Sequence, residues 1–210
     1  MRYPVKKKLL IVVLVCLLVP STLFSAAKEY KTGSMLFTFK GGTTLPTFIY
    51  FFQENELTDY RFYYGMGSGD RSTKLYPGGN FSLSFEGFTT DSLSLGGELG
   101  YNFNYTIGDT LFSIVPLFFK VTYYPVQGKF DLPISLGAGI SYMKFGEDQS
   151  LITLYANIDI GFVFYVTENW GIGIHSGFWL VPELNYTKTD RQYNSLLGMA
   201  PVVLSVSYRN

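Results

Sequence analysis

The fold is decided by the stretch Ile152–Val166, ITLYANIDIGFVFYV, in which every even-numbered position is apolar. The odd-numbered positions include Thr153, Asn157 and Asp159. Successive side chains of a strand leave opposite faces of the sheet, so this alternation predicts a β-strand with one apolar face. Strands in soluble proteins are most often about 5–6 residues long. An apolar face that continues over all of 152–166 is therefore typical of a strand that faces lipid.

The same alternation recurs along the rest of the chain. The seven further segments that we predict as strands are 34–44, 78–88, 92–105, 111–124, 130–143, 170–182 and 196–209. Each is long enough for the roughly 9–11 residues that a tilted strand needs to cross a bilayer. Eight is an even number and the smallest usual size of an outer-membrane barrel. We predict an all-β fold, an eight-stranded antiparallel transmembrane up-and-down β-barrel.

The N-terminal segment is typical of a secretory signal peptide. Four basic residues precede an apolar run at Leu9–Val19, which is too short for a membrane-spanning helix. We expect cleavage near residue 27, which leaves 28–210 as one barrel domain in the outer membrane of a bacterial cell. Cys16 is lost with the leader, so thiolate metal ligands and cysteine nucleophiles are not expected. The whole chain has 16 Lys and Arg against 16 Asp and Glu, so losing four positive charges leaves about −4. Such a charge excludes a basic nucleic-acid footprint.

Charged side chains at inward-facing positions are the first group of candidate functional residues. They form a predicted lumenal polar network of Lys40, Glu86, Glu98, Lys120, Asp159 and His175. Charges in a narrow lumen must be paired, because an unpaired buried charge costs several kcal/mol. The network is interpreted either as an ion-pair plug or as a gated polar path. His175 is the single histidine; without a local nucleophile motif or a second histidine, we predict no enzyme, no metal and no cofactor.

The connection predicted for 45–77 is the second candidate, because it is far longer than an ordinary hairpin loop. Its large rings suggest a binding surface made of Phe48, Tyr50, Phe52, Tyr60, Phe62 and Tyr64. These rings could extend the first two strands beyond the membrane or fold over the barrel mouth. Alternatively, they could line a pocket for an apolar solute or bind a partner.

A soluble lipocalin-like ligand carrier is the main rival fold, with an apolar inside and a polar outside. A surface in water should be rich in Lys and Glu, whereas the polar positions here are mostly Gly, Ser, Asn and Thr. Aromatic residues also gather toward both ends of the predicted strands, as in the interfacial girdles of membrane barrels. The composition therefore favours the membrane barrel.

Several of these segments also resemble a known group. The glycine-rich Leu136–Tyr142, the turn region Phe164–Gly173 and the terminal strand are similar to the small outer-membrane β-barrel family, which includes OmpW-like, OmpA-like and predicted spirochaetal barrels. The resemblance covers about residues 33–210 and implies the fold and an envelope location. It does not imply one function, because such barrels serve as channels, adhesins, enzymes and tethers.

We therefore expect a structural, surface-exposed outer-membrane barrel with narrow or hydrophobic small-solute passage. The alternative is an adhesin or partner-binding barrel that acts through loop 45–77, and an enzyme acting on membrane lipid is a remote third. The expected partners are outer-membrane lipid, the barrel assembly machinery, and a small apolar solute or an extracellular partner, with no nucleic acid.

Overall fold

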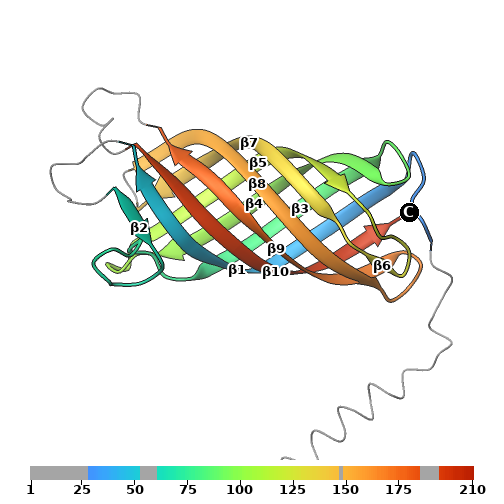
Figure 1. Ribbon diagram of the computed structural model, residues 1–210, viewed down its shortest axis with the longest axis horizontal. Coiled ribbons are helices and arrows are strands. Elements are labelled where there is room, and N and C mark those ends of the chain that lie inside the picture. Colours follow the sequence, from blue (N-terminus) through green and yellow to red (C-terminus); the bar gives the residue numbers. More distant parts are fainter. Residues whose placement is uncertain (1–27, 53–60, 147–148, 185–193) are drawn as a thin grey trace, which may run out of the picture.

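The computed structural model describes residues 28–52, 61–146, 149–184 and 194–210 (Figure 1). The leader predicted for 1–27 lies outside the described residues, so its cleavage stays a prediction. No helix in the described ranges is long and apolar enough to cross a membrane.

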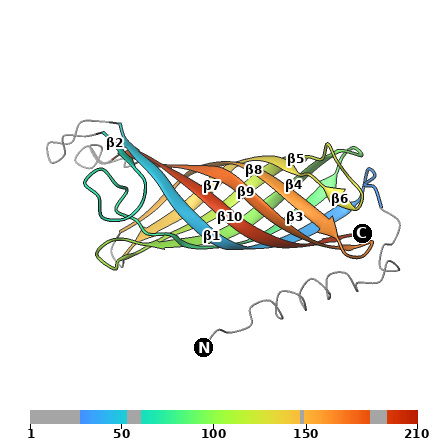
Figure 2. The same cartoon turned by 60° about the horizontal axis from the view of Figure 1, so that its bottom comes forward.

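Eight long antiparallel strands form a closed barrel, which confirms the predicted fold (Figures 1 and 2). The strands are β1 Met35–Phe51, β2 Phe62–Tyr64, β3 Gly78–Phe88, β4 Leu93–Tyr105, β5 Leu111–Tyr123, β6 Phe130–Asp131, β7 Ile134–Phe145, β8 Gln149–Tyr165, β9 Trp170–Glu183 and β10 Ser195–Arg209. Their order around the wall is β10-β9-β8-β7-β5-β4-β3-β1, and pairing of β10 with β1 closes the ring. Two short strands lie beside this ring, with β2 paired to β1 and β6 paired to β8.

Two strands differ from the sequence-based bounds by more than three residues at one end. β1 continues to Phe51 instead of ending near residue 44, because β10 pairs with it along its whole length. The strand predicted for 130–143 is interrupted before Ile134, where Pro133 has no backbone N–H to donate to a sheet ladder. The carbonyl of Pro133 still accepts a 2.9 Å hydrogen bond from the amide of Gly161 on β8. The break therefore does not open the wall.

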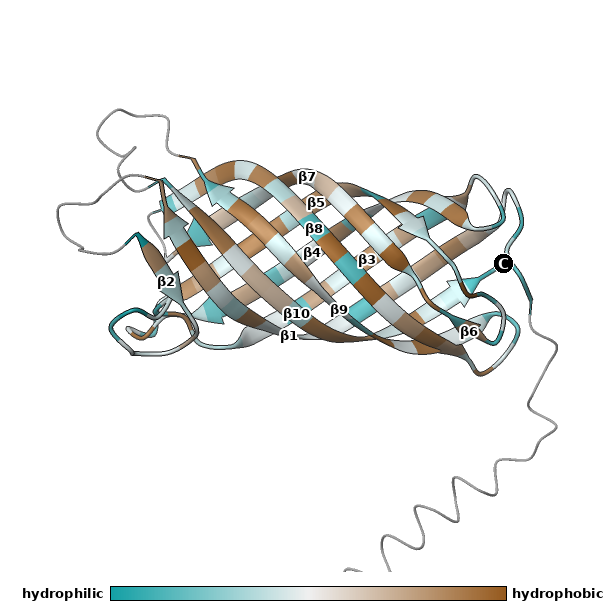
Figure 3. Cartoon of the chain, in the orientation of Figure 1, coloured by the Kyte–Doolittle hydropathy of each residue, from teal (hydrophilic) through white to brown (hydrophobic). Residues whose placement is uncertain are grey.

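Hydrophobic and hydrophilic residues alternate along the strands (Figure 3), and the large residues exposed on the outer face of the barrel are apolar. On β8 the exposed positions are the even-numbered ones from Ile152 to Phe162, as the alternation predicts. The same outward set continues around the wall with Phe37, Phe39, Phe81, Leu83, Leu99, Leu117, Phe119, Leu136, Ile140, Ile172, Ile174, Leu204 and Val206. The outward surface therefore has the polarity of a surface in contact with lipid chains rather than with water.

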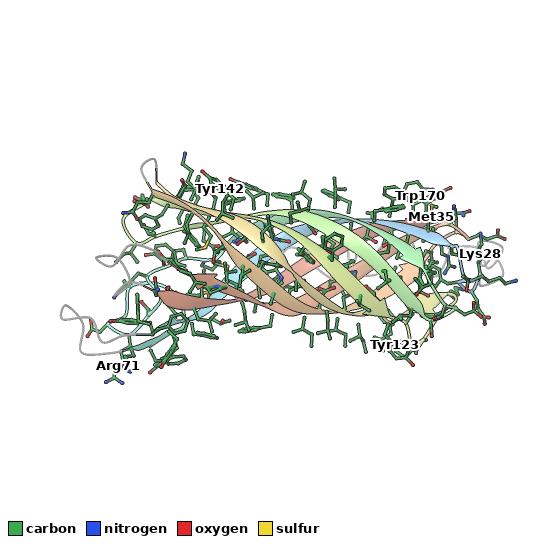
Figure 4. The ribbon with its side chains drawn as sticks, turned by 90° about the horizontal axis from the view of Figure 1, so that it is seen from above. Lys28, Met35, Arg71, Tyr123, Tyr142 and Trp170 are labelled. Carbon is green, nitrogen blue, oxygen red and sulfur yellow. The ribbon has the colours of Figure 1, made fainter. Side chains whose placement is uncertain are left out.

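The two ends of the barrel differ. One, called here the terminal end, carries the start of β1, the C-terminus and the short turns after β3, β5 and β8 (Figure 1). The opposite end, called the loop end, carries β2 and the other connections. Trp170 and Tyr123 project outward near the terminal end and Tyr142 projects toward the loop end (Figure 4). The aromatic residues Trp170 and Phe178 lie eight residues apart on β9. On a tilted strand this separation is about 20 Å along the barrel axis. This spacing is close to the height of the apolar band in membrane barrels.

Candidate functional site

The structure places all six residues of the predicted lumenal network inside the barrel. They come from six strands and are buried: Lys40 on β1, Glu86 on β3, Glu98 on β4, Lys120 on β5, Asp159 on β8 and His175 on β9. We call this group the central network. It lies about halfway along the axis, because His175 follows Trp170 at the terminal end of β9 and precedes Glu183 at its loop end.

Two lysines tie the three carboxylates of the central network together. Lys40 Nζ lies 3.4 Å from Glu98 Oε2 and 3.1 Å from Asp159 Oδ2. Lys120 Nζ lies 2.7 Å from Glu86 Oε1 and 3.1 Å from Glu98 Oε2. The resulting chain of ion pairs crosses the lumen from β8 to β3. Removing one member of such a buried pair is strongly destabilising, because the other charge is left without a partner.

Wall hydroxyls satisfy further lone pairs of these carboxylates. The hydroxyl of Ser82 donates to Glu98 Oε1 at 2.7 Å, and that of Ser94 donates to Glu86 Oε2 at 2.5 Å. Both serines lie on the strands that carry or adjoin the acids, at inward-facing positions. The small, polar inward residues thus act as hydrogen-bond donors, and they also leave space for the long charged side chains.

His175 links β9 to two neighbouring strands. Its Nδ1 lies 3.1 Å from Asp159 Oδ2 on β8, and its Nε2 lies 3.0 Å from Ser205 Oγ on β10. Gly161, directly opposite His175 on β8, makes room for the ring, because a Cβ there would stand 2.4 Å from the imidazole. The imidazole is therefore held in one orientation by both of its nitrogens.

The half of the lumen toward the loop end is filled by apolar side chains. This apolar cluster consists of Leu75, Phe112, Ile114, Phe118, Met143, Tyr155, Trp179, Val181, Leu197 and Met199. The polar residues predicted to face inward in this half, such as Asn102, Asn104 and Ser141, are buried there, but the bulky apolar residues beside them were not predicted. The sequence did indicate that some of these residues face inward, because Trp179 and Val181 are odd-numbered, like the inward-facing His175 on the same strand β9. The segment 111–124 is apolar on both faces, because Phe112, Ile114 and Phe118 point inward.

The terminal end is closed by a group that sequence reasoning missed. This terminal plug consists of Tyr30, Asp131, Tyr165 and Arg209, all of them buried. The Tyr30 hydroxyl donates to Asp131 Oδ2 at 2.6 Å and contacts the Tyr165 hydroxyl at 2.7 Å. The Arg209 guanidinium lies 3.5 Å from the centre of the Tyr165 ring, and its Nη1 lies 3.8 Å from Asp131 Oδ2.

Backbone carbonyls complete the contacts of Arg209, the residue before the C-terminus. Its Nε donates to the carbonyl of Glu168 at 2.8 Å, and its Nη2 donates to that of Gly128 at 3.0 Å. Burial raises the pKa of the Asp131 carboxyl, although the bond from Tyr30 and the nearby Arg209 act in the opposite direction. Burial is also the main reason why the pKa of the Tyr30 hydroxyl lies well above its ordinary value.

The space between the central network and the terminal plug is small. The cavity lined there by Lys40, Lys120, Asp131, Asp159 and His175 has a volume of about 10 Å³. This is close to the room that one water molecule needs. In the part of the chain that the structure describes, no group of three or more His, Cys, Asp and Glu side chains is arranged to hold a metal ion.

Four of the aromatic residues predicted as a loop surface lie on strands in the structure, and Phe52 directly follows β1. β1 pairs Phe48 with Tyr64 and Tyr50 with Phe62 of β2, so the predicted connection 45–77 includes strand at both of these places. The β1–β10 register shifts between Pro46 and Phe48, which turns even-numbered residues of β1 outward beyond this point. We call this set the aromatic end: the half-buried Phe48 and the exposed Tyr50, Phe52, Phe62 and Tyr64. Tyr60, the sixth predicted member, lies outside the described residues.

The rings of the aromatic end contact one another. Phe48 stacks on Phe62 at 5.5 Å between ring centres and on Phe178 of β9 at 6.0 Å. Tyr50 meets Phe52 at 5.9 Å, and Phe62 meets Tyr64 at 6.2 Å. The result is one continuous outward aromatic surface that begins at the level of Phe178 and continues toward the loop end.

Comparison with known proteins finds sequence relatives of this chain. A sequence model of one protein family matches residues 21–208 of this chain. An uncharacterized protein of Treponema pallidum is 28% identical over 135 residues, 64% of this chain and 60% of that protein. An uncharacterized protein of Borreliella burgdorferi is 24% identical over 132 residues, 53% of this chain and 62% of that protein. The chain thus matches about three fifths of the length of these curated relatives.

The fold has a counterpart among solved structures. The crystal structure of Neisserial surface protein A (NspA) superposes with a TM-score of 0.56 at 11% sequence identity, covering 86% of this chain and 99% of that one. At this identity the likeness concerns the fold alone.

Proposed function

We propose that this chain, which belongs to the family of spirochaete proteins matched over residues 21–208, is an integral outer-membrane β-barrel with a closed lumen. In this proposal the barrel acts through the surface it exposes at the loop end and not through passage of solutes along its axis. Its terminal end faces the periplasm, because short turns are typical of that side and longer loops of the outside.

Membrane insertion is supported by the polarity of the wall. Soluble monomers rarely expose contiguous apolar patches larger than a few hundred Å², whereas here the apolar surface continues around all eight long strands. A closed barrel pairs all of its wall strands, as a structure in lipid must. A soluble lipocalin-like carrier would need polar residues outside, and Phe119, 84% exposed in the middle of β5, has the opposite placement.

The single observation that carries the closed-lumen proposal is the filling of the barrel at three successive levels. The terminal plug fills the lumen at the terminal end, the central network fills the middle, and the apolar cluster fills the half toward the loop end. Between the first two levels there is room for about one water molecule. The ion-pair plug is thus the interpretation of the central network that the geometry favours over a gated polar path.

The test is conductance of the refolded protein in planar bilayers, with a bacterial porin in the same bilayers as the open-channel reference. We expect no conductance steps from the wild-type barrel. A Tyr155→Ala/Trp179→Ala variant lacks two contacting rings of the apolar cluster. If this cluster seals the lumen, the variant should pass more ionic current than the wild type. Regular conductance steps from the wild-type protein would contradict the proposal. Uptake of small apolar solutes that occurs only into liposomes containing the protein would contradict it as well.

The orientation can be tested separately on intact cells. The single cysteine of the chain, Cys16, lies in the predicted leader, so in the processed protein that we propose a membrane-impermeant maleimide reports one introduced thiol. Ser68→Cys, exposed at the loop end, should be labelled on intact cells, whereas Thr90→Cys, exposed in the turn after β3, should be labelled only after lysis. The reverse pattern would contradict the proposed orientation.

A second candidate function, partner binding, is favoured by the aromatic end. Phe48 lies at the level of Phe178. Tyr50 on β1 and Phe52, just after β1, stand roughly 5 and 10 Å further along the axis. Exposed aromatic rings of this kind are common in binding surfaces. We propose that this surface contacts an extracellular partner.

Adhesion of cells that display the protein to a cultured epithelial layer tests partner binding. A Tyr50→Ser/Phe62→Ser variant should lose adhesion. The matched control is Tyr76→Ser, which removes another exposed ring outside the aromatic end. Equal adhesion of the wild type and the double variant would argue against a binding role for this surface.

A further inference from the structure

The charges of the central network do not balance unless its histidine is charged. The network holds three carboxylates, Glu86, Glu98 and Asp159, against two ammonium groups, Lys40 and Lys120. With a neutral imidazole the net charge is −1, and with an imidazolium it is zero. The protonation state of His175 therefore decides whether the lumen carries a net charge.

A net charge at this position has little access to water. The apolar cluster lies on one side of the central network and the terminal plug on the other. The cavity beside the network has a volume of only about 10 Å³. A buried charge without a counterion is so unfavourable that titratable groups usually take up or release a proton instead.

The other titratable groups inside the barrel do not supply the missing positive charge. Among the residues that the structure describes, these groups are Tyr30, Tyr124, Tyr155, Tyr165, Asp131 and Arg209. The tyrosines are neutral in their ordinary protonated form. Arg209 is engaged at the terminal end by Asp131 and by the carbonyls of Glu168 and Gly128. Compensation of the central network must therefore come from within the network.

Among the network's own bases, His175 is the one best placed to take the proton. Each carboxylate contacts at least one ammonium group, so protonating an acid would remove an existing ion pair. Both imidazole nitrogens of His175 face an oxygen that can accept, Asp159 Oδ2 at 3.1 Å and Ser205 Oγ at 3.0 Å. An imidazolium donates from both nitrogens and therefore fits this pair of acceptors.

Local forces on the imidazole oppose one another. Burial and the two ammonium groups of the network act against a positive ring, whereas the Asp159 carboxylate, 3.1 Å from Nδ1, acts in favour of it. The five other side chains of the network, on β1, β3, β4, β5 and β8, together carry one more negative than positive charge. We propose that His175 is held as an imidazolium, so that the central network binds one proton and is electrically neutral. This inference concerns the interior alone and does not depend on passage or on partner binding.

The single histidine of the chain allows a direct test. Untagged protein with ¹⁵N-labelled histidine, folded in detergent micelles, gives the signals of one imidazole. At pH 7 we expect two similar nitrogen shifts, as in a doubly protonated ring. Two widely separated shifts, as in a neutral tautomer, would overturn the proposal.

Variants distinguish the overall charge balance from the local contact with Asp159. Glu86→Gln removes one negative charge from β3, where Glu86 contacts Lys120 and Ser94. We expect His175 to become neutral at pH 7 in this variant. An unchanged imidazolium would overturn the charge-balance argument.

Two controls complete the design. Ser82→Ala removes a hydrogen bond to Glu98 but no charge, so it should keep the imidazolium. Glu86→Gln/Lys120→Met removes one charge of each sign and should keep it as well. Loss of the imidazolium in either control would contradict the proposal, since neither changes the net charge. The second control also separates the effect of charge from the loss of the Glu86–Lys120 contact.

Discussion

Replacing Lys120 with methionine gives a sharp test of how the barrel interior is held together. Lys120 Nζ contacts Glu86 at 2.7 Å and Glu98 at 3.1 Å, and all three side chains are buried. Lys120→Met keeps a long side chain but removes the charge. Glu98 retains Lys40, whereas Glu86 loses its ammonium partner and keeps the Ser94 hydroxyl. Because one partner of a buried pair is left uncompensated, we expect a loss of about 3–5 kcal/mol in the free energy of unfolding.

The double variant Lys120→Met/Glu86→Gln shows whether the loss comes from the stranded charge. Replacing both members of a buried pair is often nearly neutral, so the double variant should lie within about 1.5 kcal/mol of the wild type. Urea unfolding in lipid vesicles, followed by tryptophan fluorescence and by mobility of unheated samples on gels, measures all three proteins. A loss below about 1 kcal/mol in the single variant would mean that water reaches these charges. A double variant as unstable as the single one would refute the role given to the pair.

Three further predictions concern the other levels of the lumen. Trp179→Ala, in the apolar cluster, should cost about 3–5 kcal/mol in urea unfolding, because it leaves a cavity in a packed region; a loss below about 1 kcal/mol would mean that this end is open. Gly161→Ala should cost about 1–3 kcal/mol, because the new Cβ would stand 2.4 Å from the His175 ring. Gly97→Ala is its control, since the nearest atom there is 3.7 Å away, and equal losses in both would argue against a close fit of the ring over Gly161. Burial raises the pKa of the Asp131 carboxyl, so its proton stabilises the folded state below the unfolded pKa, and this contribution is lost as pH rises through the folded value. Wild-type protein should therefore lose more stability than Asp131→Asn between about pH 3 and pH 7; parallel pH profiles would contradict this.

Much of the wall could be predicted from the sequence, because alternation is a local property. The bounds of β3 agree with the predicted 78–88, and β9 ends one residue beyond the predicted 182. The extension of β1 to Phe51 was not predicted, because it depends on pairing with β10 and on a register shift near Pro46. A shift of this kind reverses the parity on which the outward and inward assignments rest.

The contents of the lumen were less predictable. Parity placed the six charged residues of the central network inside, but their pairing depends on strand register, which alternation does not give. The terminal plug was missed because Tyr30 precedes the first strand and Arg209 ends the last. These two residues lie far apart in the sequence, and only closure of the barrel brings both of them to the terminal end. Trp179 was missed for a different reason: its inward parity was readable, but the inside was expected to be polar.

Contacts of methyl groups with lipid and with water test most directly whether a lipid-facing wall surrounds a closed lumen. In methyl-labelled protein in lipid nanodiscs, nuclear Overhauser effects report which methyls lie beside acyl chains. We expect contacts with acyl chains for the outward Ile158, Ile160 and Ile174, and contacts with neither lipid nor water for the inward Ile114 and Val181. Water contacts at the outward isoleucines would contradict a lipid-facing wall, and water contacts at Ile114 or Val181 would contradict a closed lumen.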